Sequence, residues 1–224
     1  MNYLELIRKL YSLPADQKFG FDEKLLKQTE ERLGATLPAV LKSYYLFLGK
    51  NEAVNESFNQ LVSPDKIDFV DDAYLIFFEE NQSVVLWGIK KSDLSLENPK
   101  VYATYDQERV EWFLDSETVE NFLLSMALWN GVLGGLKHTA LIDVQDKLSL
   151  NIIEAVEQGW KELTGLTNQM LRFFTNDYSE VLIFTTDHDK SVSGLYFGTN
   201  DQKKYHETIE KLNLEWDYRS DLDV

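Results

Sequence analysis

The residues most able to do chemistry in this chain are its three histidines, His138, His188 and His206. The segment Asp187-His188-Asp189 contains the side-chain types of a metal or acid–base site. It lies between two apolar runs, where Asp favours a turn because its carboxylate bonds to the nearby backbone. One histidine flanked by acids also lacks the ligand spacing of a zinc site. We therefore expect a structural turn here.

A second group of residues, Gly131, Gly134, Gly135 and Lys137, superficially resembles a phosphate-binding loop. That loop needs two glycines separated by four residues, then Lys and Ser or Thr, between a strand and a helix. Here the glycines follow a helical pattern, so we expect them to end a helix.

Other catalytic and metal-binding patterns are missing from the sequence. The chain has no cysteine, which excludes disulfides, thiolate metal sites and a cysteine nucleophile. No serine lies in a nucleophile-elbow motif. The aspartates at 65, 68, 71 and 72 lack the residue order of a calcium loop. We therefore expect no catalytic residues, no cofactor and no metal.

Acidic side chains gather in two runs, residues 65–80 and residues 106–120. If the two predicted hairpins that carry these runs are neighbours, both runs lie at one edge of a sheet. Carboxylates there would complement a basic protein surface and raise the association rate; the alternative is an ordinary solvated face. The candidate partner-binding residues are Asp65, Asp68, Asp71, Asp72, Glu79, Glu80, Asp106, Glu108 and Glu111.

The charge balance limits the class of partner. The 224 residues include 22 basic and 38 acidic side chains, which gives a formal net charge of −16. Such a field repels phosphate backbones, so nucleic-acid binding is not expected. It accelerates association with a basic partner, although net charge also serves solubility alone. A hydrophobic content of 44% and an aromatic content of 13% indicate a folded chain.

The sequence also indicates where the protein works. Residues 1–11 form an amphipathic pattern with charged residues and no long apolar run, which is not a signal peptide. No stretch reaches the roughly 18 uncharged apolar residues of a membrane span. The lack of cysteine fits a reducing compartment. We expect a cytoplasmic protein without a membrane partner.

Hydrophobic periodicity predicts helices first and hairpins afterwards. Asp22 and Ser116 are the expected N-caps of two helices, and Gly34 is an expected helix stop. The predicted helices of this part are residues 1–11, 22–34, 38–49 and 116–131. The predicted strands are residues 73–78, 83–89, 100–105 and 109–114. In the last strand, Val110, Trp112 and Leu114 are expected to face the core, and Glu111 and Phe113 to be more exposed.

The remainder of the chain alternates between helix and strand. Residues 137–148 look irregular. Predicted helices cover residues 149–163 and begin again near Asp201; predicted strands are residues 170–174, 181–186, 191–197 and a short one within 214–218. The expected fold class is α+β, with helices packed on one mostly antiparallel or mixed sheet and a C-terminal α/β extension. The expected domains are residues 1–135 and 136–224, the latter either separate or continuous with the former.

An ordered set of short motifs resembles a known family. It runs from Leu33-Gly34 and Leu37-Pro38 through Trp87-Gly88-Ile89 and Asn98-Pro99 to the helix that contains Phe122-Leu123. This order, over roughly residues 22–130, resembles the SUKH superfamily, which includes Smi/Knr-type cell-wall-assembly regulators and many bacterial immunity proteins. The resemblance implies an α+β fold and a binding role, often the neutralisation of a toxin domain. It carries over no catalytic residue.

Three functional hypotheses follow. The first is a non-catalytic immunity-type protein that binds and neutralises a basic toxin domain through an acidic face. The second is an intracellular regulatory scaffold, similar to the cell-wall-assembly regulators, that uses an apolar groove. The third is an enzyme with a site near His188.

Overall fold

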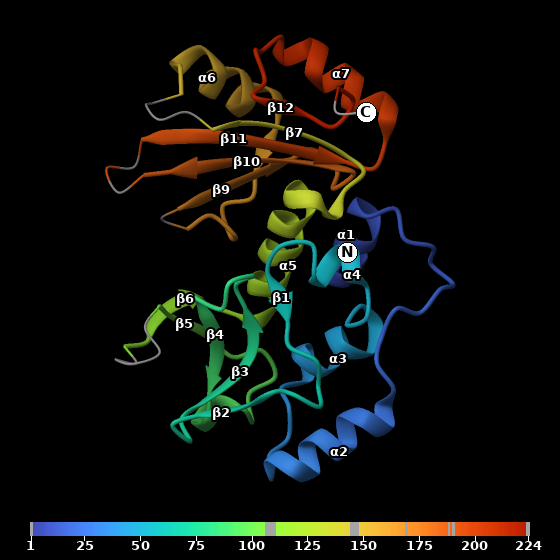
Figure 1. Ribbon diagram of the computed structural model, residues 1–224, viewed down its shortest axis with the longest axis vertical. Coiled ribbons are helices and arrows are strands. Elements are labelled where there is room, and N and C mark those ends of the chain that lie inside the picture. The colour runs from blue at the N-terminus through green and yellow to red at the C-terminus, as the bar shows by residue number, and fades with distance from the viewer. Residues whose placement is uncertain are drawn as a thin grey trace. The chain divides into compact units, whose positions relative to one another are not determined.

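The computed structural model describes residues 2–105, 111–143, 148–168, 170–187, 189 and 191–222 (Figure 1). These residues form seven α-helices and two separate antiparallel sheets. The expected α+β class is confirmed, and the C-terminal extension has a sheet of its own. None of the helices in these ranges is long and apolar enough to cross a membrane.

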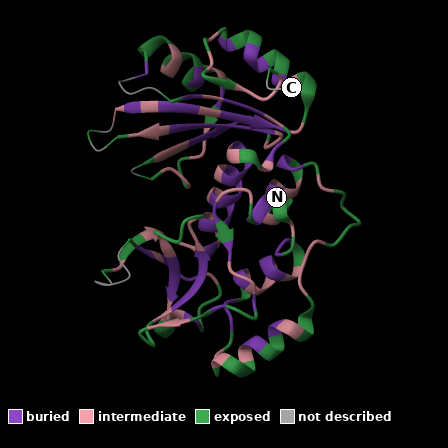
Figure 2. Cartoon of the chain, in the orientation of Figure 1, coloured by how far each residue is buried: buried purple, intermediate pink, exposed green. Residues whose placement is uncertain are grey.

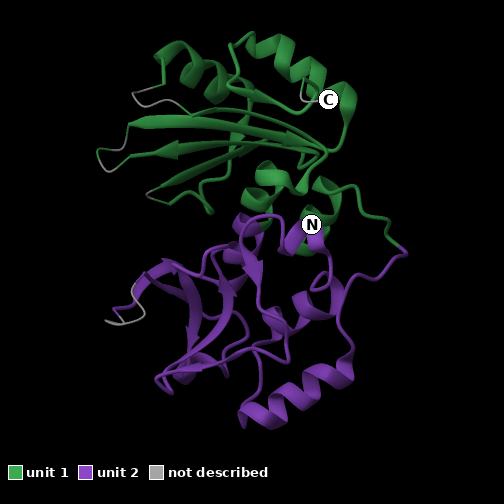
Figure 3. Cartoon of the chain, in the orientation of Figure 1, with its two compact units in different colours: residues 1–15, 127–224 green, residues 16–126 purple. Residues whose placement is uncertain are grey.

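The chain folds into two compact units (Figure 3). One unit contains residues 16–126, and the other contains residues 1–15 together with 127–224. The sequence predicts a division after residue 135. In the structure it falls within a helix a few residues earlier, and the N-terminal helix groups with the C-terminal half.

The unit of residues 16–126 contains the first sheet, with strand order β1-β3-β4-β5-β6. The short strand β2 also pairs with β3, which therefore pairs with β1, β2 and β4. All its pairings are antiparallel. Its strands are β1 Gln60–Leu61, β2 Asp68–Val70, β3 Tyr74–Glu79, β4 Leu86–Lys90, β5 Val101–Thr104 and β6 Phe113–Ser116. Its helices are α2 Glu23–Leu33, α3 Ala39–Phe47, α4 Glu52–Asn55 and the first part of α5 Val119–Asn130.

A β-bulge fixes how this sheet packs on α5. The register shifts between Ile76 and Phe78, so the alternation of faces is interrupted. As a result, Phe77 and Phe78 both contact Phe122 of α5 with ring centroids 5.4 and 5.5 Å apart. Trp87 of β4 joins them at 5.8 Å. We call the face that packs on α5 the inner face and the opposite one the outer face.

Local capping explains the helices of this unit. The side chain of Asp22 accepts a hydrogen bond from the backbone N–H of Lys24, and Gly34 ends α2 with a left-handed φ of 62°, as the sequence predicts. Helices α3 and α4 are joined by Asn55, whose side chain accepts a bond from the Tyr44 hydroxyl at 2.7 Å. Figure 2 shows burial along the strands, while α2 has a largely exposed face.

The other unit contains the second sheet, with strand order β12-β7-β11-β10-β9-β8. Its strands are β7 His138–Asp143, β8 Lys161–Glu162, β9 Leu171–Thr175, β10 Glu180–Thr186, β11 Val192–Thr199 and β12 Tyr218–Arg219. Its helices are α1 Tyr3–Leu10, α6 Leu150–Gly159, α7 Gln202–Leu212 and the end of α5. Helices α6 and α7 lie on the same side of this sheet (Figure 1). Residues from these two helices and from the sheet form one hydrophobic core, which includes Trp160, Phe174, Phe184, Phe197 and Tyr205.

Three local predictions were wrong. Residues 138–143, expected to be irregular, form β7, which pairs with β12 on one side and β11 on the other. Thr139 and Ala140 of this strand are buried. Helix α5 is capped by Thr118, whose Oγ1 accepts from the Asn121 N–H at 3.1 Å, and not by Ser116. Helix α6 ends at Gly159, before the expected residue 163, and the next residues pair with β9.

Candidate functional site

The outer face of the first sheet carries a set of neighbouring side chains fixed by the strand register. Ile76 lies opposite Gly88, and Gly88 lies opposite Tyr102. Tyr102 in turn lies opposite Leu114. Because directly opposite residues of antiparallel strands share a face, all four belong to the outer face.

Three half-buried aromatic residues, Tyr74, Tyr102 and Trp112, form a cluster on this outer face. The rings of Tyr74 and Trp112 are stacked, with centroids 4.0 Å apart and planes 12° apart. Tyr102 meets Tyr74 edge-on at 5.7 Å. The Lys90 ammonium lies 4.3 Å from the centre of the Tyr102 ring, and interaction with the Tyr102 hydroxyl raises the pKa of Lys90. We call these three residues the aromatic cluster.

Gly88 leaves little room beneath this cluster for a larger residue. A Cβ atom there would lie 3.1 Å from both the Ile76 Cδ1 and the Leu75 carbonyl oxygen, and 3.4 Å from Trp112 Cη2. The missing side chain therefore lets the Trp112 ring lie against the sheet. The sequence predicted a core position for Trp112, whereas the structure places it half-buried on the outer face.

Large apolar side chains are also exposed where β5 ends and β6 begins. Tyr105 is 56% exposed, Phe113 is 39% exposed and Leu114 is 44% exposed. The rings of Tyr105 and Phe113 stack, with centroids 4.8 Å apart. Leu114 was expected in the core; it is exposed because β6 is the edge strand of the sheet. Val110 lies outside the described residues.

The first acidic run is divided between the two ends of the sheet, and only its last part lies at the same end as the second run. Antiparallel pairing brings the end of β3 beside the beginning of β4, the end of β5 and the beginning of β6. Glu79, Glu80 and Glu111 therefore belong to one end of the sheet, which we call the glutamate end. The other end, which we call the aspartate end, contains Asp65, Asp68, Asp71 and Asp72 around β2 and the turn that leads into β3. Six residues of β3 separate the two ends by about 20 Å.

Two of the four aspartates at the aspartate end are paired with cations. Asp68 lies 3.9 Å from Arg32, and Asp72 forms an ion pair with Lys91. The Ser63 hydroxyl donates to Asp65 and lowers the pKa of that carboxyl. Asp71 and Asp72 both have a φ of 54°, so these residues also shape a tight turn.

The glutamate end has a different electrostatic character. In residues 2–105 and 111–143, no ion pair involves Glu79, Glu80 or Glu111. The Glu80 carboxylate accepts from the Gln82 N–H at 2.8 Å and so supports the β3–β4 turn. Asp106 and Glu108 lie outside the described residues. The exposed ring pair of Tyr105 and Phe113 belongs to this same end of the sheet.

One further carboxylate links this end to the core. Asp115 of β6 accepts a hydrogen bond from the Trp87 indole N–H at 3.2 Å. Burial raises the pKa of Asp115, and the bond from Trp87 opposes that shift. Trp87 packs on Phe122, so the bond ties edge strand β6 to the inner face.

The histidines do not form a site in the described residues. The ring centroid of His138 lies 5.5 Å from that of Tyr205, and His206 contacts the same ring at 5.5 Å. His188 lies outside the described residues. Asp187 and Asp189 lie in the expected turn between β10 and β11, where the Asp187 N–H donates to Ser191 O at 2.9 Å. Among the described residues, no group of three or more His, Asp or Glu side chains is arranged so that it could hold a metal ion.

The expected glycine helix stop is confirmed. Helix α5 ends at Asn130, and Gly134 has a φ of 117° that favours glycine. Gly131, Gly134 and Lys137 follow a helix and precede β7, which is the reverse of the order in a phosphate-binding loop.

No protein-family model, curated protein or solved structure matches this chain. Membership of the SUKH superfamily therefore stays a prediction from the motif order.

Proposed function

We propose that this chain is a non-catalytic protein-binding module of immunity type, and that it binds a basic toxin domain at the glutamate end of the first sheet. The observation that carries the proposal is the exposed Tyr105–Phe113 stack at the same end of the sheet as the glutamates, which have no ion-pair partner among the described basic residues. The motif order and the formal charge of −16 support the same class of partner.

The arrangement has the composition of a protein–protein interface. Aromatic residues are enriched at the centre of such interfaces, and polar groups form the rim. A few buried aromatic anchors supply most of the binding energy. Tyr105 and Phe113 provide the apolar centre. Carboxylates on the rim select a partner with a basic surface and increase its association rate.

The aspartate end offers a matched comparison within the same sheet. It has four aspartates against the three described glutamates, but Arg32 and Lys91 already pair with two of them. A basic partner that binds there must displace these cations. This difference is the reason for assigning the partner to the glutamate end rather than to both acidic runs.

The test is capture of a partner from lysates of the source cells and of close relatives at low salt. The wild-type chain is compared with the double variant Glu79→Gln/Glu111→Gln and with the control Asp68→Asn/Asp72→Asn, which removes the same charge from the aspartate end. We expect a basic protein to bind the wild type and the control, and to bind the glutamate variant about tenfold more weakly. Equal binding by all three would contradict the assignment of the site.

The immunity role has its own readout. The captured protein is expressed alone and together with this chain in a common host. We expect growth arrest in the first case and its relief in the second, with relief reduced by the glutamate variant. A captured partner without toxicity would contradict the immunity role but would not contradict the assignment of the binding site.

The aromatic cluster supports a second candidate function. Tyr74, Tyr102 and Trp112 present apolar surface on the outer face near the aspartate end, which suits a regulatory scaffold that binds without charge. In that case capture is insensitive to salt and to both charge variants, and is lost in Trp112→Ser. The same experiment therefore separates the two candidates.

A further inference from the structure

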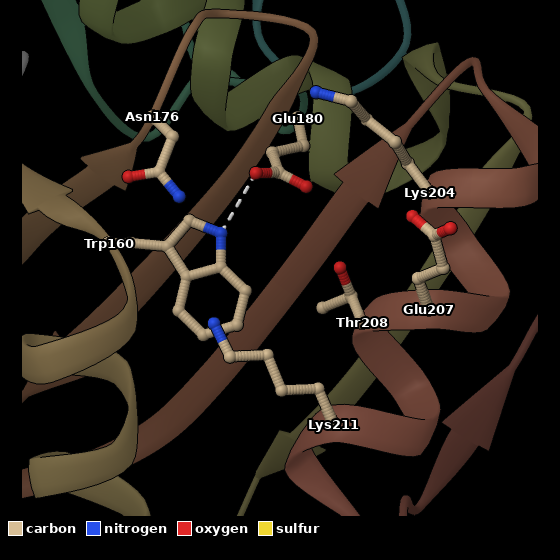
Figure 4. Close-up of a pocket in the computed structure, with 7 residues that line it drawn as sticks. All are labelled: Trp160, Asn176, Glu180, Lys204, Glu207, Thr208 and Lys211. Carbon is tan, nitrogen blue, oxygen red and sulfur yellow. Dashed lines mark hydrogen bonds between the residues drawn. The ribbon is translucent and has the colours of Figure 1, made fainter.

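The unit formed by residues 1–15 and 127–224 contains a cavity of about 190 Å³ between α7, the end of α6 and the beginning of β10. Figure 4 shows the residues that line it, among them Trp160, Glu180, Thr208 and Lys211. Pockets for drug-sized ligands measure about 300–1,000 Å³, so this one suits a smaller molecule.

One wall of the cavity presents two polar side chains, Glu180 and Thr208, whose oxygens can accept hydrogen bonds from a ligand. Glu180 is 7% exposed and Thr208 is 4% exposed. Glu180 Oε1 accepts from the Trp160 indole N–H at 2.9 Å. Within the ranges that the structure describes, neither Glu180 Oε2 nor Thr208 Oγ1 has a hydrogen-bond partner. Neither atom is among the buried side-chain atoms of the described residues that lack a partner, so both are accessible from the cavity, and this wall can accept hydrogen bonds from a ligand.

A positive charge in the lining of the cavity comes from Lys211. Its ammonium lies 3.9 Å from the centre of the Trp160 ring, a favourable cation–π geometry. Gly159 makes room for it, since a Cβ there would lie 2.8 Å from Lys211 Nζ. Although acidic residues outnumber basic ones by 38 to 22, no carboxylate of the described residues pairs with Lys211.

The remaining charges restrict the ligand further. Glu207 also lines the cavity, so an anion alone would meet two carboxylates. Lys204 lines it too, but its ammonium is already 3.0 Å from Asp177, which leaves Lys211 as the available cation. A ligand with one charge of either sign satisfies only one wall.

We propose that this cavity binds a small zwitterion, a free α-amino acid. Its ammonium donates to Glu180 Oε2 and Thr208 Oγ1, and its carboxylate pairs with Lys211, which Trp160 holds in place. This binding site is independent of the partner-binding site on the first sheet.

The test uses the full chain and the common L-amino acids as probes, by thermal shift and then by isothermal titration calorimetry. We expect at least one small amino acid to bind, and its decarboxylated amine and its deaminated acid to bind at least about tenfold more weakly, because each lacks one charged contact. Absence of binding by every amino acid, or equal binding by the amine, would overturn the proposal.

Three variants locate the site. Glu180→Gln keeps an oxygen for the Trp160 N–H but removes the charge, and Lys211→Met keeps the length of an exposed helical side chain. Each should weaken binding about tenfold or more. Lys203→Met on the same helix, which does not line the cavity, should bind as the wild type does. If Glu180→Gln does not fold, Lys211→Met decides alone: unchanged affinity in that variant contradicts the proposal.

Discussion

At the scale of single residues, Asp177 shows how the turn between β9 and β10 is stabilised. Its carboxylate accepts from the Ser179 N–H at 2.9 Å and lies 3.0 Å from the Lys204 ammonium. Lys9 of α1 approaches the same carboxylate at 3.6 Å. Partial burial acts to raise the pKa of Asp177, but the hydrogen bonds from Ser179 and the charge of Lys204 outweigh it and hold the pKa well below its usual range.

This shift predicts a stability that depends on pH. Because the pKa of Asp177 is lower in the folded state than in the unfolded state, its contribution is present above the unfolded pKa and is lost as pH falls through the folded pKa. Asp177→Asn should lower the free energy of unfolding by about 1 kcal/mol at neutral pH, since the carboxylate is partly exposed. The difference should shrink below about pH 3.

Urea denaturation of the wild type and of Asp177→Asn across this pH range measures the effect. The control is Glu154→Gln on the exposed side of α6, where the same loss of charge should change stability by less than about 0.5 kcal/mol at every pH. A difference for Asp177→Asn that stays constant with pH would show that the charge is not responsible.

At the scale of secondary-structure elements, α5 depends on a cap that lies two residues beyond the expected one. Thr118 accepts from the Asn121 N–H, and its carbonyl accepts from the Phe122 N–H at 3.1 Å. Ser116 instead ends β6, and its hydroxyl donates to the Thr118 carbonyl at 3.0 Å. Asn98 adds a bond from the Glu120 N–H at 3.0 Å, so the first turn of α5 is held from two sides.

We predict that Thr118→Ala lowers the free energy of unfolding by about 1 kcal/mol, the usual cost of losing an N-cap side chain. Thr118→Ser should retain most of the stability, because Ser is an equally good cap. Ser116→Ala should cost less than Thr118→Ala, because it leaves the Asn121 bond intact. Chemical denaturation of the three variants checks the order, and a larger loss for Ser116→Ala would restore the original assignment.

The same elements show what could be predicted from sequence. Helices α2 and α7 were predicted well because their caps, Asp22 and Asp201, and their apolar spacing are local signals. Strand β7 was missed, since Thr139 and Ala140 give little hydrophobic alternation although both are buried. The exposure of Leu114 could not be predicted either, because it depends on which strand lies at the edge of the sheet.

The candidate partner site, too, could be predicted from sequence only in part. The predicted strand 73–78 already separates Asp72 from Glu79, but only the antiparallel register of the sheet shows that Glu111 belongs to the same end as Glu79. The sequence also gives no sign that Arg32 and Lys91 pair with two carboxylates of the aspartate end, since both cations come from other segments. Tyr105 and Phe113 were missed as site residues because exposed and buried aromatic residues look alike in a strand pattern.

At the scale of the whole molecule, the charge of −16 and the local carboxylates make separable contributions to binding. A long-range field accelerates association in proportion to net charge and is screened by salt. Groups that lose water on binding mainly change the dissociation rate. The proposed function therefore predicts different kinetic effects for charge in general and for the glutamate end.

We predict that both double variants, Glu79→Gln/Glu111→Gln and Asp68→Asn/Asp72→Asn, slow association with the captured basic partner to a similar small extent at low ionic strength. Each removes two negative charges from the same field, and the difference from wild type should vanish at about 1 M salt, where the screening length is about 3 Å. Only the glutamate variant should also dissociate faster, by about tenfold, because only those carboxylates contact the partner. Surface plasmon resonance at several salt concentrations separates the two rates. If the aspartate variant dissociates as fast as the glutamate variant, the partner contacts both ends; if neither dissociates faster, charge acts on this partner only at long range.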